Sequence, residues 1–279
     1  MGGGQGHGSL AVTDGAQFTN NGIAYLGMEA GSTGQALVSG GTWTNASSIY
    51  VGDAGDGVLV IEDGGLVTNT NATIAAQAGS TGAVTANGSG VVWSSSGGLG
   101  IGGYGDAKLT VGENAIVVAQ GPIIAAAFAG SSADVIVDGT LAGLGGVTFN
   151  AGSHLSGTGT VSAGAAGTTT MNGVIAPGNS IGTLSIVGNY VQNAGSTYEV
   201  EIDADGNSDL IDISGTATLN GGEVVVVPFP DFAVATPYTI LTAAGGVTGQ
   251  FDPITTSISY FLSPELTYDP NNVYLTIQQ

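Results

Sequence analysis

The sequence repeats itself with a period of about 25 residues, and this constrains the fold more than any other feature. The pentapeptide AGSTG occurs at 30–34 and again at 78–82. Trp43 and Trp93 are separated by a similar distance, about two periods. The single period is seen in four short segments, AYLG, IYVG, TIAA and LGIG, whose last residues are Gly27, Gly52, Ala76 and Gly102. A unit this short cannot bury its own apolar face, so the units are expected to stack on one another.

Each unit contains short runs in which apolar and small polar residues alternate, as in GVLVIEDGGLVTNTN at 57–71. Alternation with a period of two, interrupted by Gly, Asn or Asp, is typical of short strands. The 51 glycines disfavour helices, and no segment has a sustained apolar stripe with helical spacing. The pattern predicts an all-β right-handed parallel β-helix (solenoid) of roughly eleven coils spaced by ~4.8 Å, since parallel crossovers are nearly always right-handed.

The composition changes after about residue 160. Seven of the eight prolines lie beyond it, and the strand-like runs become longer and richer in aromatic residues, as in STYEVEID (196–203). A solenoid needs a terminal cap, because its last coil otherwise exposes apolar area and a free strand edge. We therefore predict three parts: a flexible N-terminus over 1–9, β-helix repeats over 10–160, and a C-terminal β cap of the same β-helix over 161–279.

Charge and composition narrow the range of partners. Twenty-one acidic residues face one basic residue, Lys108, which gives a formal net charge of −20. Binding to nucleic acid or anionic lipid relies on Lys and Arg, so neither partner is expected. The absence of Cys excludes disulfides, thiolate nucleophiles and zinc sites with Cys ligands. No apolar run approaches the ~18 residues of a membrane helix, so we expect no membrane insertion, and no cofactor is indicated.

The segment GNSIG at 178–182 matches G-x-S-x-G, the pattern around the nucleophile of many serine hydrolases. That pattern requires a strand-to-helix turn, yet the next residues, TLSIVGNY (183–190), alternate like a strand. Only His7 and His154 could act as the general base. We interpret Ser180 as a turn residue and predict no catalytic residue.

Other short motifs have structural interpretations. GHG at 6–8 resembles a motif of β-helical pectin hydrolases, but those enzymes also need a basic motif, and this chain has no Arg. Three acidic turns are similar to calcium loops: GDAGDG, GGYGD and DADGNSD, at 52–57, 102–106 and 203–209. The last lacks the Gly and Glu that an EF-hand requires, and the nonapeptide-like GGYGD occurs only once. We interpret all three as solvated turns and predict no metal site.

The aromatic residues Trp43, Tyr50 and Trp93 are the candidates for binding. The two tryptophans lie two coils apart in register, so their side chains could form a stripe on one face, and aromatic side chains anchor many interfaces. The alternative is that the tryptophans form an internal stack in the core of the solenoid. The sequence favours the internal stack but leaves both interpretations open.

Four blocks in the C-terminal part carry a family resemblance. They are GVIAPGNSIGTLSIVGNYVQNAGSTYEVEID (173–203), SDLIDISGTATLNGGEVVV (208–226), PYTILTAAGGVTGQFD (237–252) and LTYDPNNVYLTI (266–277). In this order they resemble the autochaperone segment of pertactin-like autotransporter (type V secretion) passenger domains. The match covers roughly 155–279, and the upstream repeats are similar to passenger repeats in a looser way.

The resemblance implies a β-helix exported across the outer membrane of a Gram-negative bacterium, with final coils that nucleate or stabilise folding. It implies one further partner, the passenger's own translocator β-barrel in the outer membrane, which would follow Gln279. It also implies that the protein is secreted or exposed at the cell surface. The family's usual tasks are adhesion, self-association, and delivery of a toxin or protease.

We predict a non-catalytic autotransporter passenger that acts as an adhesin or virulence factor. Its partner would be a host cell-surface protein or glycan, or a second copy of the chain. Three alternatives stay open. They are a released soluble ligand for a host receptor, a β-helix enzyme that acts on polysaccharide, and a purely structural stalk.

Overall fold

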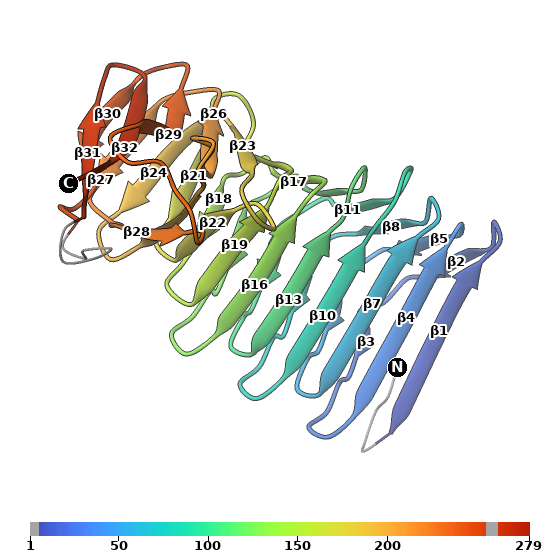
Figure 1. Cartoon of the computed structure of the whole chain (residues 1–279). Helices are drawn as coiled ribbons and strands as arrows, with labels where there is room; N and C mark the ends of the chain where they lie inside the picture. Colours follow the sequence, from blue (N-terminus) through green and yellow to red (C-terminus); the bar gives the residue numbers. More distant parts are fainter. Residues whose placement is uncertain (1–5, 255–261) are drawn as a thin grey trace.

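The computed structural model describes residues 6–254 and 262–279, and in these residues it contains strands and no helix. The strands form three sheets, and each turn of the chain adds one strand to each sheet (Figure 1). The chain is therefore a β-solenoid, as predicted. Two sheets have ten strands, which corresponds to ten coils rather than the eleven expected from the period.

Within each sheet the strands follow one another in hydrogen-bonded order along the solenoid. Sheet 1 contains β1 (His7–Thr13), β4 (Thr33–Ser39), β7 (Asp56–Glu62), β10 (Thr81–Ala86), β13 (Asp106–Val111), β16 (Ser132–Val137), β19 (Ser153–Gly157), β22 (Val174–Pro177), β25 (Thr197–Ile202) and β28 (Glu223–Pro228). Sheet 2 contains β2 (Gln17–Asn20), β5 (Thr42–Asn45), β8 (Leu66–Asn69), β11 (Val92–Ser95), β14 (Ile116–Ala119), β17 (Thr140–Gly143), β20 (Thr160–Ser162), β23 (Thr183–Val187), β26 (Leu210–Ile213), β29 (Pro237–Ala243), β32 (Asn272–Gln278) and β31 (Ser263–Tyr268). Sheet 3 contains β3 (Ala24–Leu26), β6 (Ile49–Val51), β9 (Ala72–Ile74), β12 (Leu99–Ile101), β15 (Ile123–Ala125), β18 (Val147–Phe149), β21 (Thr168–Met171), β24 (Asn189–Asn193), β27 (Ala217–Asn220) and β30 (Val247–Gln250).

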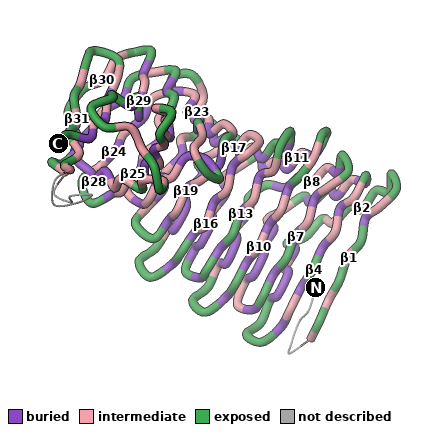
Figure 2. Tube along the Cα trace, in the orientation of Figure 1, coloured by how far each residue is buried: buried purple, intermediate pink, exposed green. Residues whose placement is uncertain are grey.

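The core follows directly from the alternation in the sequence. In most strands every second residue is buried, and these residues stack on equivalent residues of the neighbouring coils along the solenoid (Figure 2). In sheet 2, for example, Val67 lies in register between Trp43 and Trp93. Burial of apolar area stabilises by about 25 cal/mol per Å², so each coil that stacks on its neighbour adds to the stability of the solenoid.

In the first five coils the residue directly after the sheet 3 strand is left-handed, and this explains the glycine series in the sequence. Gly52 has φ of 77°, and a Cβ there would lie 2.0 Å from the carbonyl oxygen of Thr81. Backbone hydrogen bonds place Ala75, not Ala76, at the equivalent position of the next coil, with φ of 53°. The repeat alignment drawn from the sequence is therefore shifted by one residue in this coil.

The C-terminal end of the solenoid is covered by an antiparallel hairpin. β32 pairs antiparallel with β29 and with β31, whereas the other pairings between named strands are parallel. Val273, Leu275 and Ile277 of β32 are buried against the last coil. The hairpin thus covers the apolar end and occupies the free edge of β29, which is the arrangement that a cap requires.

The predicted division into 1–9, 10–160 and 161–279 is not marked by a break in the sheets. All three sheets continue past residue 160, which is the first residue of β20. β1 begins at His7, while residues 1–5 of the predicted flexible N-terminus lie outside the described residues. The division into these three parts therefore stays a prediction, which concerns how stable each part is.

Candidate functional site

Trp43 and Trp93 lie in the core and do not form a surface stripe. Their side chains are 0% and 1% exposed, and both belong to the inward-facing row of sheet 2. The binding role suggested for the two indoles as a surface stripe is therefore wrong, and the internal alternative describes the structure. The reason is register, since each tryptophan occupies the inward phase of the two-residue alternation.

Tyr50, the third candidate, lies on the outward face of sheet 3. Its ring stacks on that of Tyr25 in the previous coil, with ring centroids 5.2 Å apart and an interplanar angle of 10°. Both tyrosines are partly exposed. Tyr50 therefore remains a candidate for binding by position.

A second stacked pair, Tyr104 and Phe128, was not identified from the sequence. The ring centroids are 4.2 Å apart at an interplanar angle of 5°, and each residue is 50% exposed. Both residues lie in the loops from sheet 3 to sheet 1, in adjacent coils. The signal was present, because both residues occur two positions after the left-handed corner residue of their coil. The motif GGYGD was compared only with calcium loops and was interpreted as a solvated turn.

The acidic turns use their carboxylates within the chain. Asp203 accepts hydrogen bonds from the backbone N–H groups of Asp205 and Asn207 and from the side-chain amide of Asn207. The hydrogen bond from the side-chain amide of Asn207 is the main reason that the pKa of Asp203 lies below its usual value. Across the described residues, no group of three or more His, Asp or Glu side chains could hold a metal ion.

Ser180 lies in the loop between β22 and β23, as expected for a turn residue. Gly178 in this loop has φ of 95°, and the loop leads into a strand rather than into the helix of a nucleophile elbow. Surface pockets of about 630 and 250 Å³ share Ser180 as a lining residue. The smaller one is also lined by His154 and Ser156 of β19, so the structure brings a histidine and two serines into one groove.

His154 continues a row of charged side chains on the outward face of sheet 1. Its Nδ1 lies 3.7 Å from Oδ1 of Asp134, and the other oxygen of Asp134 is 2.8 Å from Nζ of Lys108. The three residues occupy equivalent positions in successive strands. An acid that faces a histidine nitrogen is the arrangement that orients a general base, although here the acid is shared with a lysine.

Asp209 forms a buried polar floor for the smaller groove. It is 2% exposed, and its carboxylate accepts hydrogen bonds from the backbone N–H groups of Gly182 at 2.9 Å and Glu201 at 2.8 Å. Burial raises the pKa of Asp209 to about 7, even though both N–H groups favour the charged form. This carboxylate ties the 178–182 loop to β25 and was not identified from the sequence.

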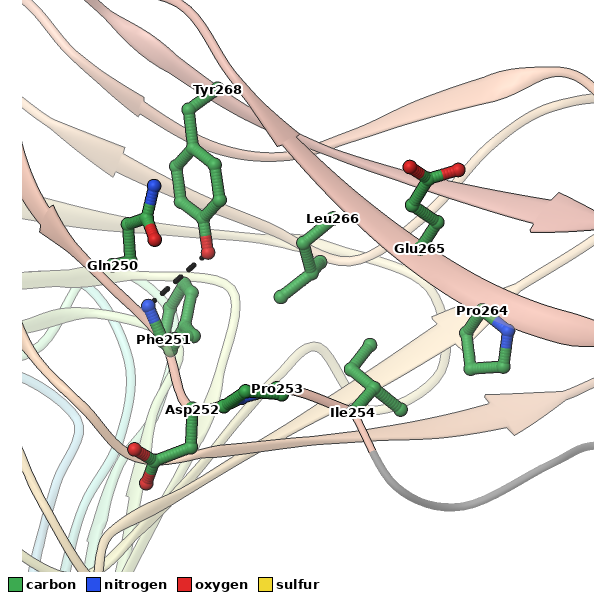
Figure 3. Close-up of a pocket in the computed structure, with 9 residues that line it drawn as sticks. All are labelled: Gln250, Phe251, Asp252, Pro253, Ile254, Pro264, Glu265, Leu266 and Tyr268. Atoms are coloured by element: carbon green, nitrogen blue, oxygen red, sulfur yellow. Dashed lines mark hydrogen bonds between the residues drawn. The ribbon is translucent and has the colours of Figure 1, made fainter.

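A further pocket of about 270 Å³ lies at the C-terminal cap, between the end of β30 and β31 (Figure 3). Phe251 donates its backbone N–H to the hydroxyl of Tyr268 at 3.2 Å. Leu266 and Ile254 form an apolar wall (Figure 3). Asp252 accepts a hydrogen bond from the backbone N–H of Gly222 at 2.9 Å. The polar groups described here form hydrogen bonds within the chain, and we therefore regard this pocket as part of the packing of the cap.

Comparisons with known proteins give one informative relative. No family model matches the chain. An extracellular serine protease from Serratia marcescens is 38% identical over 133 residues, which is 44% of this chain and 12% of that protein. The chain therefore covers only a small part of the relative's length.

These findings confirm the resemblance to an autotransporter passenger domain. The chain has the parallel β-solenoid that the resemblance implies, and its relative is extracellular. The chain is thus similar, in its fold and over part of its sequence, to a secreted passenger domain. None of the described residues forms a helix long and apolar enough to cross a membrane.

The comparison corrects one prediction. The chain was expected not to be an enzyme, and this expectation is contradicted because the relative is a serine protease. For serine chemistry, the interpretation of the sequence depended on a single motif, the nucleophile elbow. Serine, histidine and acid side chains can be brought together on unrelated folds and in different chain order, so the failure of one motif does not exclude catalysis.

Proposed function

We propose that the chain is a secreted passenger that recognises a partner through the surface of its repeat half, residues 10–160. The observation that carries the proposal is the exposed stacked pair Tyr104 and Phe128. In the C-terminal part, by contrast, Tyr190, Tyr198 and Tyr238 are fully buried, and the other described aromatic residues are at most partly exposed. Aromatic side chains contribute binding area at a low entropic cost, so an exposed aromatic pair is better explained by recognition than by folding.

The surrounding charge favours a partner with basic groups. The chain has 21 acidic residues, and its single basic side chain, Lys108, already pairs with Asp134. A cationic group over an aromatic ring contributes about 0.5–2 kcal/mol. A basic segment of a host cell-surface protein therefore fits this surface, and adhesion at the cell surface is the role that follows. A released form that acts as a soluble ligand would use the same surface.

The test is a binding titration onto host cells and onto the immobilised chain itself. The full chain is compared with the double variant Tyr104→Ala and Phe128→Ala, and with Ile116→Ala, which removes an exposed apolar side chain from sheet 2. We expect the double variant to lose at least tenfold in affinity and the control to bind normally. Binding should also weaken with added salt, because screening reduces attraction between exposed charges. Equal binding by all three proteins would reject the proposal.

The C-terminal part is proposed to act as an autochaperone, a segment that stabilises the folding solenoid. What supports this is the antiparallel hairpin of β31 and β32, which covers the last coil. A covered end provides a stable coil on which further coils can be added, as in other repeat proteins.

Proteolysis is a second candidate function, favoured by the groove beside β19. His154 faces Asp134, and Ser156 and Ser180 line the same groove as His154. The test is labelling by a fluorophosphonate probe and cleavage of a mixed peptide substrate. If the groove is catalytic, Ser180→Ala or Ser156→Ala should abolish labelling, whereas Ser94→Ala on sheet 2 should not. No labelling of the wild-type chain would reject this candidate.

A further inference from the structure

Charged residues are confined to one side of the solenoid over its first eight coils. Between residues 6 and 193, every Asp, Glu, Lys and His lies in a strand of sheet 1 or in a loop next to one. Sheets 2 and 3 and the loops that join them contain none of these residues in 17–26, 42–51, 66–74, 92–101, 116–125, 140–149, 160–171 and 183–193. Charged residues make up 8% of the chain, so an even distribution would put several of them here.

On this uncharged side, the outward face of sheet 2 carries a row of hydroxyl groups. Thr19, Thr44, Thr68 and Ser94 pair in register in the successive strands β2, β5, β8 and β11 (Figure 1). Adjacent strands lie ~4.8 Å apart, so the hydroxyls of this hydroxyl row repeat at about that spacing. None of the four hydroxyls forms a hydrogen bond with another described residue. Each hydroxyl is therefore available to donate to a ligand and to accept from it.

An apolar row lies beside the hydroxyl row on the same face. Leu66 comes two residues before Thr68, and Val92 comes two residues before Ser94, so both apolar side chains point outward from β8 and β11. Leu66 and Val92 pair in register and are partly exposed. The face therefore offers apolar contact and uncharged hydrogen-bonding groups side by side.

The outward face of sheet 1 has a different chemistry, because carboxylates alternate with its hydroxyls. Thr81 donates a hydrogen bond to Asp56 at 2.6 Å, and Ser132 donates to Asp106 at 2.7 Å. A ligand that bound there would replace these hydrogen bonds and would meet negative charge. The uncharged face of sheet 2 imposes neither cost.

The composition of the face distinguishes between possible partners. The core of a protein interface is depleted of charge, but it is also depleted of Ser and enriched in aromatic residues. No aromatic side chain points outward from β2, β5, β8 or β11, where hydroxyls predominate. A second copy of the chain is further disfavoured by repulsion, since each copy has a net charge of −20. An uncharged polysaccharide presents hydroxyls and C–H groups, which complement the two rows, and its binding desolvates no charged group.

We propose that the outward face of β2, β5, β8 and β11 is a binding surface for an uncharged polysaccharide. The polysaccharide lies along the solenoid, across successive coils. Its hydroxyls exchange hydrogen bonds with the hydroxyl row, and its C–H groups pack against the apolar row. This surface is separate from the Tyr104–Phe128 pair and does not depend on the function proposed for that pair.

The test is native gel electrophoresis of the full chain in gels that contain a dissolved polysaccharide, where binding retards the protein band. The uncharged probes are hydroxyethyl cellulose, a β-1,3-glucan, galactomannan and dextran, and alginate is the anionic reference. We expect at least one uncharged probe to retard the chain, with a dissociation constant that added salt leaves unchanged, and alginate to have no effect. The salt response separates this surface from the Tyr104–Phe128 pair, where binding is expected to weaken with salt.

Two double variants locate the effect. Thr44→Val with Thr68→Val removes two adjacent hydroxyls and keeps the β-branched shape, so the chain should bind the retarding probe about tenfold more weakly. Thr85→Val with Thr110→Val is the matched control, because these two threonines are adjacent in register on the outward face of sheet 1. The control should bind like the wild type, and melting temperatures show whether both variants fold.

Three results would overturn the proposal. The first is that no uncharged probe retards the wild-type chain, an outcome that needs no variant. The second is that both double variants lose affinity equally, or not at all. The third is a wild-type dimer in analytical ultracentrifugation that the Thr44 and Thr68 double variant does not form, which would assign the face to a second copy of the chain.

Discussion

Trp93 Nε1 donates a hydrogen bond of 2.7 Å to Oδ1 of Asn69, which lies one coil earlier in the chain. Both side chains are buried, and the amide of Asn69 in turn donates to Ser95 Oγ at 2.8 Å. This chain of two hydrogen bonds joins adjacent coils inside the core. It fixes the register of β8 against β11 as well as contributing to stability.

Asn69→Ala should therefore destabilise the solenoid. The substitution leaves Trp93 Nε1 buried without an acceptor, which costs about 1–3 kcal/mol in free energy of unfolding. Asn21→Ala, at an exposed position of the same residue type, should change that free energy by less than about 0.5 kcal/mol. Urea unfolding followed by circular dichroism measures both. Equal midpoints for the two variants would show that the Asn69 contact adds no stability.

The left-handed corners allow a matched test with two glycines. Gly52 and Gly79 have φ of 77° and 80°, but a Cβ at Gly52 would lie 2.0 Å from the carbonyl oxygen of Thr81, while a Cβ at Gly79 meets nothing within 4 Å. Gly79→Ala should cost about 1–2 kcal/mol through backbone strain alone. Gly52→Ala adds a clash with backbone and should lower the melting temperature further. Similar melting temperatures for the two variants would contradict the close approach of coils at this corner.

Asp209 should make stability depend on pH. Its folded-state pKa is about 7 against an ordinary value of 3.8, so the folded chain holds this proton more tightly than the unfolded chain. Asp209 therefore makes its full contribution to the free energy of unfolding below about pH 4. This contribution is lost as the pH rises to about 7, and the free energy of unfolding then falls by at most ~1.4 kcal/mol per pH unit.

Asp209→Asn tests this dependence by urea unfolding at several pH values. In this variant the free energy of unfolding should lose most of its dependence on pH between about pH 4 and 7. Asp205→Asn, in the exposed turn, should keep the wild-type dependence. The other carboxylates also contribute to the slope through the net charge of −20, which the Asp205 control takes into account. An Asp209→Asn variant with the wild-type slope would refute the assignment.

Truncation tests the role of the C-terminal part. Residues 161–279 contain the antiparallel cap and the buried Tyr190, Tyr198 and Tyr238, so this fragment should retain a strand-type circular dichroism spectrum and unfold cooperatively. Residues 1–160 lack a covered end and should aggregate or remain unfolded. A stable 1–160 fragment beside an unfolded 161–279 fragment would reject the autochaperone proposal.

The cap illustrates what the sequence could and could not predict. Prolines and longer aromatic runs indicated that the end of the chain differs from the repeats, because a stack of coils needs such an end. The antiparallel pairing of β32 with β29 was not predictable, since the alternation of β32 suits either direction of pairing. Similarly, DADGNSD was correctly interpreted as a turn, but the burial of Asp209 at its end depends on the loop at 178–182 that packs over it.

The sequence by itself determined the solenoid, because a period of about 25 residues with two-residue alternation leaves stacking as the only way to bury the apolar positions. The tertiary structure decided which aromatic residues face solvent. Trp43 and Trp93 are inside, Tyr104 and Phe128 are outside, and the period alone is compatible with either arrangement. For the tryptophans the physical reason is that a shift of one residue exchanges the two faces of a strand, whereas Tyr104 and Phe128 lie in loops, where the two-residue alternation does not apply. Only the packing of neighbouring coils fixes that phase.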